Sequence, residues 1–175
     1  MNIYLIGYRC TGKTTIGKAL AAHLKWPFLD TDQQIVKESQ ATIAEIVQQK
    51  GWDFFRKKER NVVVQFSRKS GYVVATGGGV ILDEGNIGIM KTTGFVVWLN
   101  ARSETIEKWM CKDENTGDSR PSLTSESLKD EIRQTLAQRL PLYKKAACLK
   151  VDTDAFDINR ICMMISRAFD RKLKK

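Results

Sequence analysis

The sequence predicts a three-layer α/β/α domain built on a five-stranded parallel sheet, and three observations favour this fold class. A glycine-rich loop, Gly7 to Thr14, stands between a short apolar run and an amphipathic segment. Apolar runs alternate along the chain with segments of helical periodicity, as in sheets covered by helices on both faces. The 175 residues, 42% of them hydrophobic, can bury one substantial core, so we expect a single domain over residues 1–175.

The first strand and the loop after it carry the strongest motif. Residues 2–6 read Asn-Ile-Tyr-Leu-Ile, and residues 7–14 read Gly-Tyr-Arg-Cys-Thr-Gly-Lys-Thr, the pattern of a phosphate loop. In such a loop, backbone N–H groups turn inward on nucleotide phosphates, a lysine adds positive charge, and a hydroxyl binds Mg²⁺. We therefore expect a nucleotide site with Lys13 on the phosphates and Thr14 on the metal. The alternative is an ordinary glycine turn between a strand and a helix.

Two acids follow the second predicted strand. The helical periodicity of residues 13–25 is closed by Pro27, and Pro27-Phe28-Leu29 then enters a strand that ends at Asp30-Thr31-Asp32. In a doubly wound sheet, ligands gather at the carboxyl ends of the strands. We therefore expect both acids to point into the crevice that contains the phosphate loop.

Residues of about 33–70 are expected to form a helical insertion that carries a second substrate. The helical pattern of residues 35–50 is interrupted near residues 40–42, where Thr42 and Glu45 match a capping box. Gly51 ends this helix, and a further helix is expected from Trp52 to about Lys69.

Three successive glycines follow the third predicted strand, residues 71–75. The segment reads Thr76-Gly77-Gly78-Gly79. Because glycines remove every side chain from a strand end, they suit a place where a ligand rests against the backbone. A bulged or flexible turn is the structural alternative.

The second half of the chain completes the alternation. Strands are expected at residues 94–99 and 147–151, and helices at residues 84–91, 103–111, 128–143 with an interruption near Pro141, and 158–173. Between two of these helices, residues of about 112–125 are almost wholly polar and lack apolar periodicity. They form either a passive loop or a mobile lid.

Composition limits the classes of partner. The net charge of +9 would suit nucleic acid, but the basic residues are spread along the chain, and the dense cluster at residues 171–175 fits a solvated tail. We expect no nucleic-acid partner. No apolar stretch approaches the length needed to cross a membrane. The 4 cysteines lack paired spacing, as in a reduced cytoplasmic protein, and the single histidine is assigned no role.

Several motifs occur together in the order found in one family, and the whole chain resembles the shikimate kinases. The matching features are Gly7 to Thr14, Asp30-Thr31-Asp32, Phe55-Arg56 with Glu59, Thr76-Gly77-Gly78-Gly79, Arg120-Pro121 with Leu123, and Arg139 with Pro141-Leu142-Tyr143. The resemblance implies a P-loop kinase fold with strand order 2-3-1-4-5, and transfer of the ATP γ-phosphoryl group to the 3-hydroxyl of shikimate.

The resemblance also implies a nucleotide site. Backbone amides of the loop and the Lys13 ammonium would hold the phosphates, Thr14 would bind Mg²⁺ directly, and Asp30 would reach the metal through water. The loop amides concerned belong to Cys10, Thr11, Gly12, Lys13, Thr14 and Thr15.

The acceptor site follows in the same way. Asp32 would accept a hydrogen bond from the substrate hydroxyl and act as a base or an orienting group. Arg56 and Arg139 would bind the shikimate carboxylate, since a planar guanidinium can form two parallel hydrogen bonds to it. The backbone of Gly78 and Gly79 would meet the ring hydroxyls. Arg120, in the lid, would close over ATP and neutralise charge on the transferred group.

The chain departs from the family pattern at two positions. Cys10 stands where the family commonly has glycine, which reduces backbone freedom in the phosphate loop. The family often carries an arginine early in the lid that stacks on adenine, and this chain offers only Lys112 nearby.

Two alternative functions remain at this stage. A related small-metabolite kinase, of the gluconate or nucleoside monophosphate type, would share the loop but differ in its acceptor. A non-catalytic homologue would instead bind a partner through its basic surface, although Lys13, Asp32 and Arg56 are all present. The expected enzyme is a cytoplasmic monomer that binds ATP and shikimate.

Overall fold

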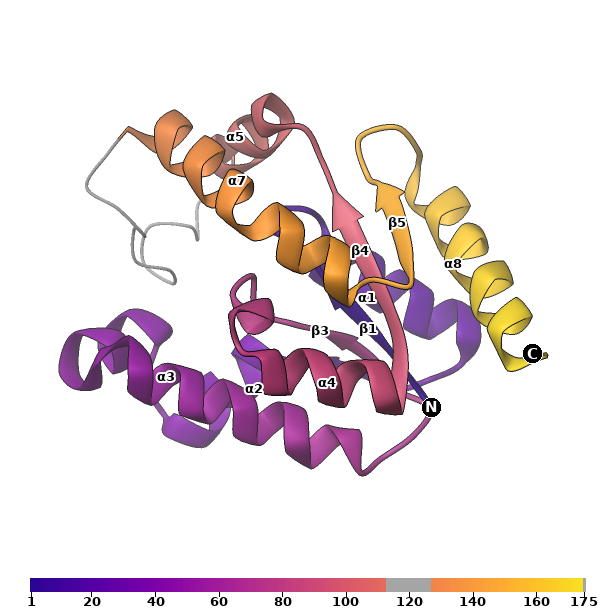
Figure 1. Cartoon of the computed structure of the whole chain (residues 1–175), viewed down its shortest axis with the longest axis horizontal. Helices are drawn as coiled ribbons and strands as arrows, with labels where there is room; N and C mark the ends of the chain where they lie inside the picture. The colour runs from indigo at the N-terminus through magenta and orange to yellow at the C-terminus, as the bar shows by residue number, and fades with distance from the viewer. Residues whose placement is uncertain (113–126, 175) are drawn as a thin grey trace.

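The computed structural model describes residues 1–112 and 127–174, in which five parallel strands form one sheet (Figure 1). The sheet order is β2-β3-β1-β4-β5, so the expected fold class and strand order are confirmed. The strands are β1 (Asn2–Ile6), β2 (Phe28–Asp30), β3 (Val73–Ala75), β4 (Gly94–Asn100) and β5 (Leu149–Asp152).

Helices cover both faces of this sheet. The helices before β4 are α1 (Lys13–Leu24), α2 (Thr31–Ser39), α3 (Ile43–Ser67), the 3₁₀ turn η1 (Val80–Leu82) and α4 (Glu84–Thr93). Those after it are α5 (Ser103–Lys112), α7 (Leu128–Ala146) and α8 (Ile158–Leu173). Among the described residues, no helix is both long and apolar enough to cross a lipid bilayer.

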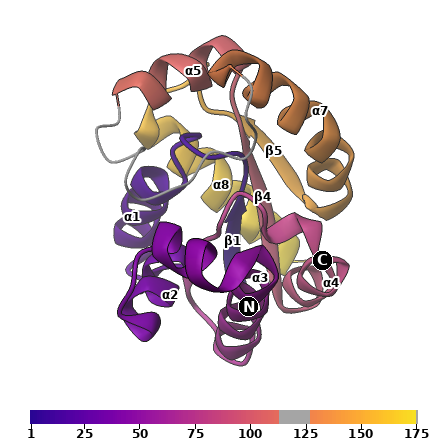
Figure 2. The ribbon, with the colours of Figure 1, turned by 90° about the vertical axis from the view of Figure 1, so that its left-hand side faces the viewer.

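Alternation along the strands divides the core into two apolar layers. In β1, Tyr4 and Ile6 pack with side chains of α3, α4 and α7, whereas Ile3 and Leu5 pack with side chains of α1 and α8. A third apolar cluster joins α5 and α7 to Tyr8 of the phosphate loop. The second view shows α5 and α7 above the sheet ends and α2 and α3 below them (Figure 2).

The helical insertion has the break that the sequence predicts. Thr42 and Glu45 form a complete capping box, in which the Thr42 backbone N–H donates to Glu45 at 2.7 Å and Glu45 N–H donates to Thr42 Oγ1 at 3.2 Å. Gly51 lies inside α3 with non-helical angles, φ 78° and ψ 168°. Two helical segments therefore meet at a kink at this glycine.

Two local predictions are wrong. Helix α2 begins at Thr31 rather than near Ile35, because the Asp30 carboxylate accepts hydrogen bonds from the backbone N–H groups of Asp32 and Gln33 and caps the helix. Helix α7 runs through Pro141 without the expected interruption. Its side chains are anchored on both sides of the proline, because Arg139 and Tyr143 both donate to the carbonyl of Gly78.

The predicted lid lies almost entirely outside the described residues. Residues 113–126, which include Arg120, lie outside the described residues, and Lys112 is the last residue of α5.

Candidate active site

Two glycines set the path of the phosphate loop between β1 and α1. Gly7 has φ 148°, and a Cβ atom there would collide with the carbonyl oxygen of Leu99 in β4. Gly12 is left-handed, with φ 85°, directly before the first residue of α1. Any L side chain would be strained in either conformation, so the backbone turn that begins α1 depends on both glycines.

Cys10 has the backbone conformation that glycine favours. Its φ is 60°, in the left-handed region, which costs a residue with a Cβ atom roughly 1–2 kcal/mol. The backbone therefore adopts the left-handed conformation at a position where the family commonly has glycine, at a cost in backbone strain.

The ammonium group of Lys13 lies against the backbone of the phosphate loop. Its Nζ atom donates to the carbonyl oxygens of Gly7 at 2.9 Å and Tyr8 at 2.7 Å. Its residue is only 8% exposed. The ammonium group is therefore held beside the cleft in which phosphates would bind.

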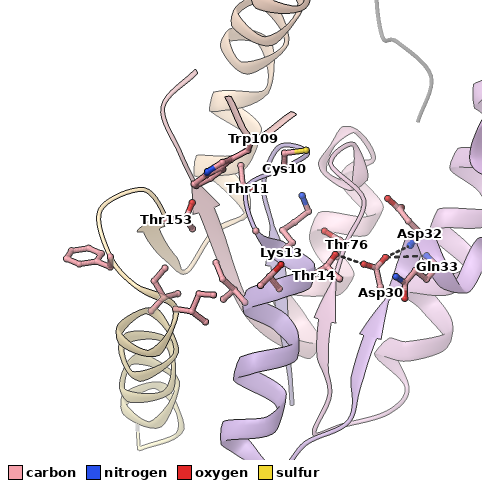
Figure 3. Close-up of a pocket in the computed structure, with 16 residues that line it drawn as sticks. Cys10, Thr11, Lys13, Thr14, Asp30, Asp32, Gln33, Thr76, Trp109 and Thr153 are labelled. Carbon is pink, nitrogen blue, oxygen red and sulfur yellow. Dashed lines mark hydrogen bonds between the residues drawn. The ribbon is translucent and has the colours of Figure 1, made fainter. Parts of the chain in front are cut away.

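A cleft of ≈ 620 Å³ opens over this loop (Figure 3). The six expected loop residues, Cys10 to Thr15, all line it. Figure 3 shows Trp109 and Thr153 on one side of Lys13 and Asp30 and Asp32 on the other. The cleft thus brings the loop together with both acids that follow β2, as expected.

Thr14 and Asp30 form a pair of oxygen donors at the edge of the cleft. Thr14 Oγ1 donates to Asp30 Oδ2 at 2.8 Å. Among the described residues, no group of three or more His, Cys, Asp or Glu side chains could hold a metal ion. This donor set fits Mg²⁺, which takes one or two protein oxygens and completes its shell with phosphate oxygens and water.

A smaller cavity of ≈ 60 Å³ lies next to the cleft. Its lining includes Arg56, Gly78, Gly79 and Arg139, the residues expected to bind the acceptor. Asp32 lines this cavity and the larger cleft alike. The first turn of α2 therefore places one carboxylate at the junction of the cleft and the cavity.

The glycines after β3 allow charged side chains to approach the backbone. A Cβ atom on Gly77 would lie 2.5 Å from Glu59 Oε1 and 2.7 Å from Asp32 Oδ1. A Cβ atom on Gly79 would collide with the guanidinium of Arg56. The glycine run is thus a close-packed wall of the smaller cavity, which favours a ligand-binding role over a flexible turn.

Arg56 is held by a carboxylate that the sequence motif contains. Arg56 Nη1 donates to Glu59 Oε2 at 2.7 Å, and Glu59 is fully buried. Burial raises the pKa of Glu59 to about 7, and the charge of Asp32 adds to this rise, whereas Arg56 opposes it. Glu59 is therefore a titratable group in the wall of the smaller cavity.

Arg139 approaches the cavity from α7. Arg139 Nη1 and the Tyr143 hydroxyl donate to the carbonyl oxygen of Gly78, at 3.1 and 2.8 Å. The Tyr143 ring stacks on Trp98 of β4, and burial raises the pKa of its hydroxyl. These contacts of α7 therefore hold both Gly78 and Arg139 in place.

Sequence reasoning missed several lining residues. Trp109 and Phe156 line the larger cleft, and Tyr8, Arg9 and Glu59 line the smaller cavity. The first two belong to α5 and the β5–α8 loop, and neither lies in a recognisable motif. Glu59 could have been assigned, because its spacing of three residues from Arg56 on a helix places the two side chains together.

Comparison with known proteins agrees with this geometry. The family model described as shikimate kinase matches residues 9–169. A shikimate kinase of Syntrophus aciditrophicus is 38% identical over 96% of this chain and 90% of its own length. One from Rhodopirellula baltica is 36% identical, over 95% of this chain and 89% of its own.

Solved structures are similar over the same length. A shikimate kinase from Acinetobacter baumannii in complex with shikimate has a TM-score of 0.91 at 32% identity, covering 99% of this chain and 95% of its own. The enzyme from Bacteroides thetaiotaomicron has a TM-score of 0.88 at 30% identity, covering 97% and 98%. A gluconokinase from Sinorhizobium meliloti, covering 97% and 91%, shares the fold alone, with a TM-score of 0.57 and 16% identity.

Proposed function

The chain belongs to the shikimate kinase family, and we propose that its two cavities bind ATP and shikimate on either side of Asp32. Enzymes of this family transfer the γ-phosphoryl group of ATP to the 3-hydroxyl of shikimate, giving shikimate 3-phosphate and ADP. The single observation that supports the proposed arrangement is that Asp32 lines both cavities.

The nucleotide would occupy the larger cleft. The loop amides of Cys10 to Thr15 would bind its phosphates, and Lys13 would exchange its contacts with the loop carbonyls for contacts with phosphate oxygens. Trp109 lines the cleft on the side opposite Asp30 and Asp32, and it is our candidate for the aromatic residue that contacts the adenine ring.

Thr14 and Asp30 would hold Mg²⁺ with the phosphates, through the hydroxyl and, by way of water, the carboxylate. When bound, the ion supplies positive charge that offsets the charge of the phosphoryl oxygens. The hydrogen bond between the two side chains keeps both oxygens at the edge of the cleft.

The acceptor would occupy the smaller cavity. Arg56 and Arg139 supply two guanidinium groups on its walls, which suits a small hydroxy acid with one carboxylate. Glu59 fixes Arg56, and the Gly78 carbonyl fixes Arg139, so the clamp is assembled before the substrate arrives. The backbone of Gly78 and Gly79 would contact the ring hydroxyls.

Asp32 then lies where the two substrates meet. It would accept the hydrogen bond of the 3-hydroxyl and orient this oxygen toward the γ-phosphorus. As the new P–O bond forms, the bond between the γ-phosphorus and the ADP oxygen breaks, and the hydroxyl proton passes to the Asp32 carboxylate. Arg120 lies outside the described residues, and its role in closing over ATP stays a prediction.

We also propose that the enzyme acts as a monomer in the cytoplasm. Size-exclusion chromatography with light scattering would test it.

A coupled assay of ADP release tests the substrate assignment. With ATP and Mg²⁺, we expect rapid turnover on shikimate and background rates on gluconate and on nucleoside monophosphates. Preferred turnover on gluconate or a nucleotide would contradict the acceptor assignment. If no acceptor in the panel supported ADP release, the assignments of both the nucleotide and the acceptor would be contradicted.

A further inference from the structure

A buried ion pair connects the phosphate loop to α7. Arg9 of the loop pairs with Glu131 in the first turn of α7, and their side chains are only 9% and 2% exposed. The Tyr8 hydroxyl also donates to Glu131 Oε1, at 3.4 Å. Burying two charges costs much of what their attraction gains, so the pair is a weak source of stability by itself. Arg9 and Tyr8 also line the smaller cavity, so the pair borders the proposed acceptor site directly. The reaction described above assigns the pair no role.

The loop end of this pair is adjacent to the nucleotide site. The carbonyl oxygen of Tyr8, next to Arg9 in the chain, accepts hydrogen bonds from Lys13 Nζ at 2.7 Å and from Thr11 Oγ1 at 2.8 Å. Phosphates that draw the Lys13 ammonium toward themselves change this contact directly. Nucleotide binding therefore acts on the backbone from which the Tyr8 and Arg9 side chains project.

The helix end of the pair is adjacent to the acceptor site. Glu131 and Arg139 lie eight residues apart in α7, a little over two turns, and both approach the loop. The Cζ atoms of Arg9 and Arg139 lie 5.7 and 6.0 Å from the centre of the Tyr8 ring. The ring is thus in contact with a guanidinium of the phosphate loop and a guanidinium of the proposed carboxylate clamp.

We propose that the Arg9–Glu131 pair couples nucleotide binding to acceptor binding by holding α7, and with it Arg139, against Tyr8. The packed chain from the loop through Tyr8 to α7 supplies the physical connection between the sites. A nucleotide that orders the loop then strengthens acceptor binding, and the acceptor strengthens nucleotide binding by the same factor. Arg9 and Glu131 are positioning residues in this scheme. The proposal rests on the assignment of the two cavities to ATP and shikimate.

Calorimetric titration of shikimate in the presence and absence of saturating Mg-ADP measures the coupling. For the wild-type protein we expect shikimate to bind at least about fivefold more tightly when ADP is bound. In Glu131→Gln, and in the double variant Arg9→Met with Glu131→Gln, we expect this ratio to fall toward one. Because the double variant removes both buried charges, we expect it to remain folded even if the single variant does not.

A second ion pair of α7 provides the matched control. Lys145 Nζ donates to Glu84 of α4 at 2.5 Å, at the opposite end of the helix. Lys145→Met should therefore leave the ADP-dependent ratio at its wild-type value. Thermal denaturation followed by circular dichroism checks that each variant is folded.

The outcomes separate this inference from the proposed function. If the wild-type protein binds both ligands but its affinity for shikimate is the same with and without Mg-ADP, the coupling alone is overturned. The coupling is also overturned if the folded double variant shows the same ADP-dependent change in shikimate affinity as the wild-type protein. Failure of the wild-type protein to bind either ligand would overturn the proposed function and the coupling together.

Discussion

Asp32 and Glu59 meet over the α-carbon of Gly77. A Cβ atom built on that glycine would lie 2.7 Å from Asp32 Oδ1 and 2.5 Å from Glu59 Oε1, closer than real Cβ contacts. The absence of a side chain at this position therefore allows two carboxylates, one from α2 and one from α3, to face the same cavity. Their proximity contributes to the raised pKa of Glu59.

Gly77→Ala should therefore disrupt the acceptor site. The added methyl group must displace one carboxylate or the backbone, and small misplacements of reacting groups cost roughly a hundredfold in rate. We expect kcat/KM for shikimate to fall by about that factor. Gly88→Ala in α4 is the matched control, because nothing lies within 4 Å of its Cβ position. Equal activity of the two variants would show that the close approach over Gly77 has no function.

The buried Glu59 should make stability depend on pH between about 4.5 and 7. Its pKa is raised from 4.5 to about 7 in the folded protein, so in this range the folded state binds more protons than the unfolded state. Stability is consequently lost as pH rises through this window. Relative to Glu59→Gln, we expect the wild-type free energy of unfolding to decline by up to about 3 kcal/mol.

Urea titrations at pH 5 and pH 8 measure this difference. Because glutamine does not titrate, the pH profile of the free energy of unfolding of Glu59→Gln contains the contributions of all other groups and serves as the reference. Parallel pH profiles of the two proteins would mean that Glu59 does not change its charge in this range.

Arg56→Lys should weaken acceptor binding selectively. Lysine keeps the charge but cannot form two parallel hydrogen bonds to a carboxylate, and a lost charged hydrogen bond costs roughly 1.5–3 kcal/mol. We expect KM for shikimate to rise about tenfold or more with little change in KM for ATP. Arg60→Lys, on the same helix and paired with Asp83 at the surface, should change neither. A comparable rise in both KM values for Arg56→Lys would remove Arg56 from the acceptor site.

Trp109 should report nucleotide binding. Its ring lines the cleft, and loss of an aromatic contact to a base costs roughly 1–3 kcal/mol. We expect Trp109→Ala to weaken ATP binding about tenfold, and Trp109→Phe to retain most of the affinity. The change in tryptophan fluorescence on adding ADP should disappear in Trp109→Phe, although three tryptophans remain. An unaltered fluorescence response would place the base elsewhere.

The sequence predicted what local patterns determine. The phosphate loop was identified because its glycines and lysine are contiguous, and the capping box at Thr42 because its partners lie three residues apart. The strand order needed the family resemblance, since alternation alone does not specify which strands are neighbours.

Contacts between distant segments were beyond sequence reasoning. Helix α7 continues through Pro141, and the side chains of Arg139 and Tyr143 on either side of the proline bind the carbonyl of Gly78, more than sixty residues earlier in the chain. The raised pKa of Glu59 depends on burial by elements that converge only in the folded state. Trp109 belongs to no motif, and only the arrangement of α5 beside the phosphate loop brings it to the cleft.

The central claim is that Asp32 lies between the two substrates and orients the acceptor hydroxyl toward the γ-phosphoryl group. It is tested most directly by measuring turnover and substrate binding of Asp32→Asn. Acid–base and orienting groups contribute about a hundredfold or more, so we expect kcat to fall by at least that factor. The variant should still bind ATP and shikimate in calorimetric titrations, because the phosphate loop and the arginine clamp are intact. Turnover close to that of the wild-type enzyme would contradict the account.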